Sequence, residues 1–186
     1  ADVHHTPPKI PIWRFLLKYY CSLPPSDRNE FSNELKEAPP RLWSHNCKTG
    51  EVSLLAPSTL YFETEDLKRF FCYCGAVAFV DEQHYQGLVG EKFRDDIREL
   101  LGSLGVASIP RLKNVELSHS EAYAIKGTKW AYSTGFDKWT EPQIDGLPEA
   151  FKALDVEFDV AVQKKLSLVI WKALAAVAKN CEATTG

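Results

Sequence analysis

The sequence predicts an α+β fold, a helix-rich single unit with a hairpin and a few short strands. Apolar residues make up 45% of the 186 residues, which is enough for a substantial core. Several windows repeat apolar residues every three or four positions, as amphipathic helices do, whereas the runs with strand character are short. Proline and glycine separate these segments, as expected at turns and helix ends.

The N-terminal part is expected to form an extended arm and two helices. Residues 1–11 are rich in proline and polar residues, which favours the arm. The next apolar residues share one face of a short helix: Trp13, Leu16, Leu17 and Tyr20. Ser26 is a suitable N-cap for a second helix, which we expect to end near Lys36 because two prolines follow.

A hairpin and a short joint are predicted next. Residues 41–57 have the pattern of a hairpin, with Gly50 in the turn because it can adopt positive φ. Residues 58–62 are then extended, and Thr64 caps a helix. The buried face of that helix is Leu67, Phe70 and Phe71. Residues 76–80 form a compact apolar run, typical of a buried strand.

The C-terminal half contains the clearest helices. Residues 91–106 carry one apolar face, and it consists of Phe93, Ile97, Leu100, Leu101 and Leu104. Residues 106–117 are expected to be extended, and residues 118–127 to form a helix. The final helix should run from about Phe158 to Lys179. We expect its apolar face to pack on the helix of residues 91–106.

One domain is predicted over residues 12–180, with a weak seam at residues 128–146, where the sequence is rich in loops. The five cysteines are an odd number in a chain of this size, which favours free thiols in a reducing compartment. The longest apolar run, residues 166–178, is too short to span a membrane. The sequence has no methionine, so we expect a processed product or a piece of a longer protein.

Motifs of common enzymes do not occur in the sequence. The ten glycines are dispersed, and neither a phosphate-binding glycine loop nor a nucleophile elbow is present. We therefore predict no enzymatic activity, no catalytic residues and no cofactor. A net charge of −3, with 22 basic and 25 acidic residues, argues against a large nucleic-acid footprint.

The best candidate metal site combines four residues with suitable ligand atoms: His45, Cys47, Cys72 and Cys74. Two residues at positions i and i+2 of a helix point in nearly opposite directions, so Cys72 and Cys74 are poorly placed to chelate together. Their neighbours are aromatic, which favours buried, inert thiols. We predict core thiols and no metal, with a small zinc-stabilised domain as the alternative.

Two acidic groups have structural explanations. Asp95 and Asp96 lie on the polar face of a predicted helix and are expected to be solvated. Glu63, Glu65 and Asp66 surround the predicted start of another helix, where negative charge is favourable. The sequence therefore assigns these carboxylates to solvation and helix capping, not to catalysis.

The segment from 128 to 140 mixes aromatic residues with lysine. Such a mixture can stack on bases or bind peptides, and loops often carry function. The predicted partner-binding residues are Trp130, Tyr132, Phe136, Lys138 and Trp139. The alternative is that these aromatic side chains only cover an edge of the core.

Three pieces of sequence occur in a recognisable order. They are "PPRLWSHNCKTGEVSLLAPSTLYFETEDLKRFF", then "AFVDEQHYQGLVGEKFRDDIRELLGSLGVASIPRL", then "IDGLPEAF" followed by "KLSLVIWKAL". This order, over residues 39–175, resembles the region downstream of the GHKL-type ATPase module in large sacsin-like and NO VEIN-like ATP-binding proteins. The GHKL pocket itself needs an Asn-bearing helix and Gly-rich loops, and this sequence lacks them.

The resemblance implies a non-catalytic interaction or scaffold module of a larger intracellular ATP-binding protein, chaperone-like or defence-related. It implies a protein partner, or neighbouring domains of the parent chain, in the cytoplasm or nucleus and not in a membrane. The alternative function is a nucleic-acid-associated module that uses the aromatic and lysine residues of the segment 128–140.

Overall fold

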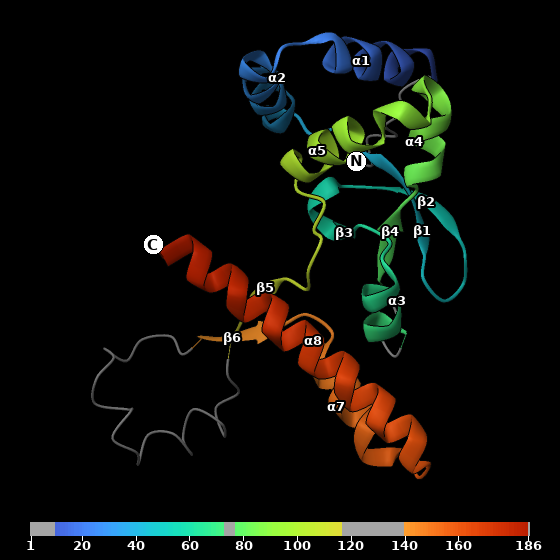
Figure 1. Ribbon diagram of the computed structural model, residues 1–186, viewed down its shortest axis with the longest axis vertical. Coiled ribbons are helices and arrows are strands. Elements are labelled where there is room, and N and C mark those ends of the chain that lie inside the picture. Colours follow the sequence, from blue (N-terminus) through green and yellow to red (C-terminus); the bar gives the residue numbers. More distant parts are fainter. Residues whose placement is uncertain (1–9, 73–76, 117–139, 186) are drawn as a thin grey trace, which may run out of the picture. The chain divides into compact units, whose positions relative to one another are not determined.

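The computed structural model describes residues 10–72, 77–116 and 140–185 (Figure 1). Helices make up most of these residues, and short strands form two small sheets. The predicted helix-rich α+β fold with a hairpin and a few short strands is therefore confirmed. Contacts divide the chain into two compact units, residues 1–109 (unit 1) and residues 110–186 (unit 2). Whether residues 12–180 act as one domain stays a prediction.

Helix α1 (Ile10–Ser22) begins two residues before the end of the predicted arm. The arm prediction is therefore wrong at Ile10 and Pro11, and residues 1–9 lie outside the described part. Proline is tolerated in the first turn of a helix because its missing N–H has no intrahelical acceptor there. The predicted inner face is confirmed at three positions, which are almost completely buried: Trp13, Leu17 and Tyr20.

Helix α2 (Pro25–Glu37) starts two residues earlier than predicted. Pro25 occupies the first turn, and the N-cap position falls on Pro24. Ser26, the predicted cap, instead donates its hydroxyl to the Asp27 carboxylate at 2.7 Å. The start of this helix thus relies on proline's restricted φ and on an acid in the first turn.

The sheet of unit 1 is built around the predicted hairpin. Strand β1 (Leu42–Asn46) pairs antiparallel with β2 (Val52–Leu55), and Gly50 in the turn has φ 66°. The hairpin is extended by β4 (Ala78–Val80), antiparallel to β1, and by β3 (Leu60–Tyr61), parallel to β4. The strand order is therefore β2-β1-β4-β3.

The joint after the hairpin differs from the prediction at Ser58 and Thr59, which are expected to be extended but lie in a 3-10 turn. A 3-10 turn, η1 (Pro57–Thr59), precedes β3, and helix α3 (Glu65–Phe71) follows it. The Leu67 N–H donates to the Thr64 hydroxyl oxygen at 3.2 Å, so the predicted cap is confirmed. The predicted buried face of α3 is also confirmed, since Leu67, Phe70 and Phe71 are all buried.

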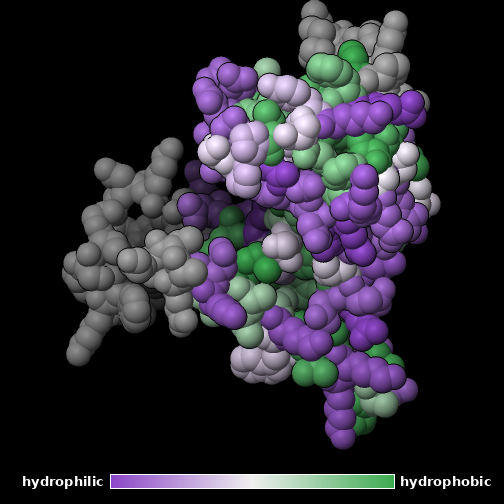
Figure 2. Space-filling view, turned by 45° about the horizontal axis from the view of Figure 1, so that its top comes forward, coloured by the Kyte–Doolittle hydropathy of each residue, from purple (hydrophilic) through white to green (hydrophobic). Residues whose placement is uncertain are grey.

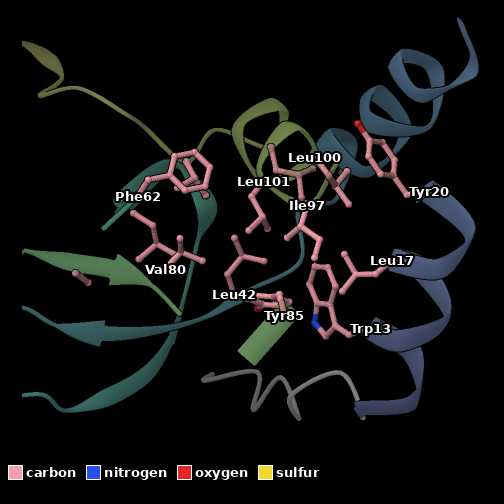
Figure 3. Close-up of a cluster of buried hydrophobic side chains, with 14 residues drawn as sticks. Trp13, Leu17, Tyr20, Leu42, Phe62, Val80, Tyr85, Ile97, Leu100 and Leu101 are labelled. Atoms are coloured by element: carbon pink, nitrogen blue, oxygen red, sulfur yellow. The ribbon is translucent and has the colours of Figure 1, made fainter. Parts of the chain in front are cut away.

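The main core of unit 1 lies between its helices and the sheet. Helix α4 (Glu82–Val89), turn η2 (Glu91–Phe93) and helix α5 (Arg94–Ser103) follow β4. Figure 3 shows side chains from α1, α4, α5 and the sheet converging on one cluster. Its labelled members are Trp13, Leu17, Tyr20, Leu42, Phe62, Val80, Tyr85, Ile97, Leu100 and Leu101.

The apolar face of α5 packs within unit 1 against residues of α1, α4 and the sheet. The expected packing of the final helix, which belongs to unit 2, on α5 stays a prediction. The predicted apolar positions themselves are correct, because Ile97, Leu100 and Leu101 are buried. Gly105, just beyond the end of the helix, has φ 109°, a conformation that side chains with a Cβ rarely adopt.

Among its described residues, unit 2 contains a two-stranded sheet and two helices. Strand β5 (Leu112–Glu116) pairs antiparallel with β6 (Thr140–Ile144), so the predicted loop-rich segment 128–146 is wrong at its C-terminal end. Residues 117–139 lie outside the described part. Helix α7 (Leu147–Val156) precedes α8 (Val160–Thr185), which is longer than the predicted final helix. The buried stripe of α8 is Leu166, Ile170, Ala173 and Val177.

Two buried tyrosines of the core make the stability of unit 1 depend on pH in the alkaline range. Burial, helped by the Glu99 carboxylate, raises the pKa of Tyr20 to about 12. Burial also raises the pKa of Tyr85, whose hydroxyl accepts a hydrogen bond from the Trp43 N–H at 2.8 Å. In the unfolded chain a tyrosine ionises near pH 10, at about its reference value. The stabilising contribution is therefore complete below about pH 10 and is lost as the pH rises through the folded pKa.

We expect the free energy of unfolding to fall between about pH 10 and 12, and to fall less steeply in Tyr20→Phe. Denaturant titrations at several pH values measure this slope. Tyr19→Phe is the matched control, because Tyr19 is largely exposed. Equal slopes for wild type and Tyr20→Phe would contradict the prediction.

Candidate functional site

The partner-binding residues suggested by the sequence fall outside the described part of the chain. They are Trp130, Tyr132, Phe136, Lys138 and Trp139. Both their suggested role in a partner-binding loop and the nucleic-acid alternative built on them therefore stay predictions. The described residues contain two other candidates, a polar groove and an exposed aromatic face, both in unit 1.

The alternative metal site is not assembled from the residues that the sequence suggested. His45 Nε2 lies 3.0 Å from a Glu63 carboxylate oxygen. The Cys47 thiol faces the carbonyl oxygen of Phe71 at 3.9 Å, and the Cys72 thiol donates to the Arg69 carbonyl at 3.0 Å. Cys74 lies outside the described residues. Among the residues described, no group of three His, Cys, Asp or Glu side chains is placed to hold a metal ion.

The prediction of buried, inert core thiols is wrong for Cys72, which is exposed, and Cys47 is only half-buried. The reason is that Cys72 lies at the C-terminal end of α3, one position beyond the buried Phe71, where the helix turns its next residue outward. Neighbouring aromatic residues in the sequence are thus a poor guide to the burial of these thiols.

Metal removal provides a direct test of the zinc alternative. We expect a chelator to leave the melting temperature unchanged, since His45 and the described cysteines are engaged with protein groups. Loss of a structural zinc would instead cost several kcal/mol or unfold the domain. Thermal melts with and without EDTA, together with elemental analysis, make this measurement. Stoichiometric zinc would contradict the prediction.

A polar groove in unit 1 is centred on Glu63. Its cavity volume is about 620 Å³, and its lining is mostly charged or amide side chains. Both carboxylate oxygens of Glu63 are engaged: one lies 3.0 Å from His45 Nε2, and the other lies 2.6 Å from Lys68 Nζ. The hydrogen bond from Lys68 to Glu63 raises the pKa of the Lys68 ammonium group. Three elements thus meet at one carboxylate: the hairpin, the joint and α3.

The role of Glu63 corrects the sequence interpretation. Glu63 precedes the cap residue Thr64 and therefore lies outside helix α3, where it bridges His45 and Lys68. The assignment to helix capping fits Glu65 and Asp66, which occupy the first turn. No local signal distinguishes Glu63 from these two acids, because its partner His45 belongs to another strand.

The environment of Asp96, one of the two acids predicted to be solvated on α5, also differs from the prediction. Asp96 is not simply solvated: its carboxylate lies 2.6 Å from the Arg28 guanidinium, which also contacts Glu99 at 3.0 Å. Arg28 in addition lies over the ring of Tyr20, 5.1 Å from its centroid. This cluster joins α2 to α5 and α1, so its function is structural.

The chemistry available in the polar groove is limited by how its groups are paired. Glu82 accepts two hydrogen bonds from Arg98, at 2.7 and 2.9 Å. The Thr64 hydroxyl is used by the helix cap, and the Asp81 carboxylate accepts from the His84 N–H at 3.1 Å. The Nε2 of His45 faces the Glu63 carboxylate at 3.0 Å. The groove therefore has the character of a surface held together by internal ion pairs.

The outer face of α1 has the opposite character. Ile12, Phe15 and Tyr19 are 49%, 68% and 47% exposed, although they alternate along the helix with core residues. The rings of Phe15 and Tyr19 are stacked, with centroids 6.3 Å apart and an angle of 7° between planes. Figure 2 shows that apolar residues reach the surface of the molecule among hydrophilic ones. We call Ile12, Phe15 and Tyr19 the outer stripe of α1.

A further contact connects the outer stripe to α2. The Tyr19 ring lies 5.6 Å from that of Phe31, which in turn lies 5.9 Å from that of the buried Tyr20. The exposed rings are therefore held from one end by an aromatic chain that reaches the core. Sequence analysis missed this stripe because only the inner face of the helix was sought, although positions 12, 15 and 19 have helical spacing themselves.

Comparison of the chain with protein-family models, with curated proteins and with solved structures gives no significant match. Within the residues described, no helix has the length and apolar character needed to cross a membrane.

Proposed function

We propose that the chain is a non-catalytic interaction or scaffold module of a larger intracellular ATP-binding protein, chaperone-like or defence-related. It would hold a protein partner or couple neighbouring domains of the parent chain. The observation that carries this proposal is the outer stripe of α1, where three large apolar side chains are exposed on a helix whose opposite face is firmly packed. Exposed aromatic residues on a rigid element are typical of protein interfaces.

The pairing of charges in the polar groove also favours a scaffold over an enzyme. Charged groups that connect separate elements have a structural explanation that requires no catalytic role. Here Glu63, Glu82 and Thr64 are already engaged with protein partners that connect separate elements. These contacts serve to hold the hairpin, α3, α4 and α5 in place.

The proposal that the chain belongs to a larger protein is based on its resemblance to the region downstream of a GHKL-type ATPase module. In this proposal the chain couples neighbouring domains or holds a protein partner and does not bind nucleotide itself. The sequence supports this, since its ten glycines are dispersed and form no phosphate-binding loop.

Nucleotide binding tests the proposal. We expect the purified chain to give no saturable heat with ATP and Mg²⁺ in calorimetry, and to release no phosphate. Saturable binding at micromolar affinity, or turnover, would overturn the non-catalytic assignment.

The parent gene provides the second test. We expect its sequence upstream of these residues to encode an ATPase module with an Asn-bearing helix and a glycine-rich lid. A start codon directly before Ala1 together with a stop codon directly after Gly186 would overturn the assignment to a larger protein.

A further inference from the structure

The outer stripe of α1 is organised for contact with another helix. Its members, Ile12, Phe15 and Tyr19, follow the spacing i, i+3, i+7, so they form a row along the helix. The parallel stacking of Phe15 and Tyr19 limits the motion of two exposed rings before any partner arrives. Contact with Phe31 anchors that ring pair at one end. A surface ordered in advance loses less conformational entropy on binding.

The charge beside this stripe is positive. Helix α1 contains two charged residues, Arg14 and Lys18, and no acid. Both are exposed, and four positions apart they form a second row along one flank of the stripe. The chain as a whole has a net charge of −3, so this helix differs in sign from the rest of the molecule. A partner with carboxylates beside its apolar residues complements both rows.

An anionic membrane surface would also favour aromatic and basic residues, but the neighbouring helix argues against it. Four carboxylates of α2 are exposed: Asp27, Glu30, Glu34 and Glu37. Figure 1 shows α2 leaving the C-terminal end of α1 at a steep angle. The carboxylates of α2 add negative charge beyond the C-terminal end of α1, which disfavours a broad anionic surface more than a single helix lying along α1.

We propose that the outer stripe of α1, with Arg14 and Lys18, binds an acidic amphipathic helix of a protein partner. The apolar residues of the partner helix pack against Ile12, Phe15 and Tyr19. The carboxylates of the partner helix lie beside Arg14 and Lys18. This is a helix-on-helix mode of recognition, in which apolar anchors supply affinity and charge supplies orientation. The inference rests on the proposed function and names the class of partner.

Synthetic peptides test this directly. The probe is a fluorescein-labelled amphipathic helix with leucines spaced by three and four positions and glutamates on the flanks. Two comparison peptides replace the glutamates by lysines or the leucines by serines. With the full chain, we expect micromolar affinity for the acidic peptide, measured by fluorescence anisotropy, and a weakening as salt is added. We expect little binding of either comparison peptide.

Variants of α1 locate the site. We expect Phe15→Ala and Lys18→Glu each to weaken binding of the acidic peptide about tenfold or more. Lys48→Glu in the hairpin turn makes the same change of charge at another exposed position, and its affinity should stay within about twofold of wild type. All three positions are exposed, so circular dichroism melts should match that of the unchanged chain.

Three results would overturn the inference. The first is equal binding of the lysine and glutamate peptides, and the second is binding that Phe15→Ala leaves unchanged. The third is that no peptide binds, while phosphatidylserine vesicles bind to the chain and Phe15→Ala weakens that binding. This result would assign the outer stripe to a membrane surface. None of these results affects the nucleotide and gene tests, so failure of the partner class is distinguishable from failure of the proposed function.

Discussion

Leu100→Ala is expected to destabilise unit 1 by about 2–5 kcal/mol, because it removes a fully buried side chain and leaves a cavity. Leu100 is 0% exposed and lies in the core cluster together with Trp13, Leu17 and Ile97. Protein domains have free energies of unfolding of about 5–15 kcal/mol, so this single change would remove a large fraction of the stability of unit 1. Denaturant titration, followed by circular dichroism, measures the loss.

Leu168→Ala is the matched control, since it makes the same chemical change at a position that is 59% exposed. We expect its free energy of unfolding to stay within about 0.5 kcal/mol of wild type. If the two variants had similar stabilities, the position of Leu100 at the centre of the core would be contradicted.

Phe71→Ala, in a different part of unit 1, is expected to lower the free energy of unfolding by about 3–5 kcal/mol. Phe71 is 0% exposed and belongs to an aromatic group near α3. Its ring centroid lies 4.7 Å from that of Tyr61, 5.1 Å from that of Phe70 and 6.5 Å from that of Phe79. Truncation therefore loses several ring contacts at once and opens a cavity between α3 and the sheet.

Phe15→Ala is the control for Phe71→Ala, because Phe15 is 68% exposed. We expect a change within about 0.5 kcal/mol. The same variant should weaken peptide binding, so the pair separates a stabilising aromatic residue from a binding one. Loss of stability in Phe15→Ala as large as in Phe71→Ala would contradict the assignment of Phe15 to an open surface.

Local signals were sufficient for the cap of α3 and for the hairpin turn. Thr64 caps the helix through the Leu67 N–H. Gly50 adopts the positive φ that the hairpin turn requires. Each of these features depends on atoms a few positions apart, and the residue types concerned have strong conformational preferences. Sequence reasoning therefore predicted them correctly.

Charge pairing could not be predicted in the same way. Arg28 and Asp96 are 68 positions apart in the sequence, yet their side chains form an ion pair of 2.6 Å. Glu63 was indistinguishable from the capping acids beside it, although it joins His45 and Lys68. An exposed acid and a paired acid have the same local sequence pattern, because the partner is supplied by the fold.

The sequence by itself determined the helix-rich α+β class, most helix and strand positions, and the apolar faces of α1, α3 and α5. Periodicity and capping depend on neighbours within one or two helical turns, so they are present in the sequence. Only the tertiary structure decided that α1 and α4 cover the apolar face of α5. It also decided that Phe15 and Tyr19 remain at the surface beside Arg14 and Lys18. The physical reason is that apolar faces attract one another without direction, so chain connectivity and side-chain shape select which faces meet.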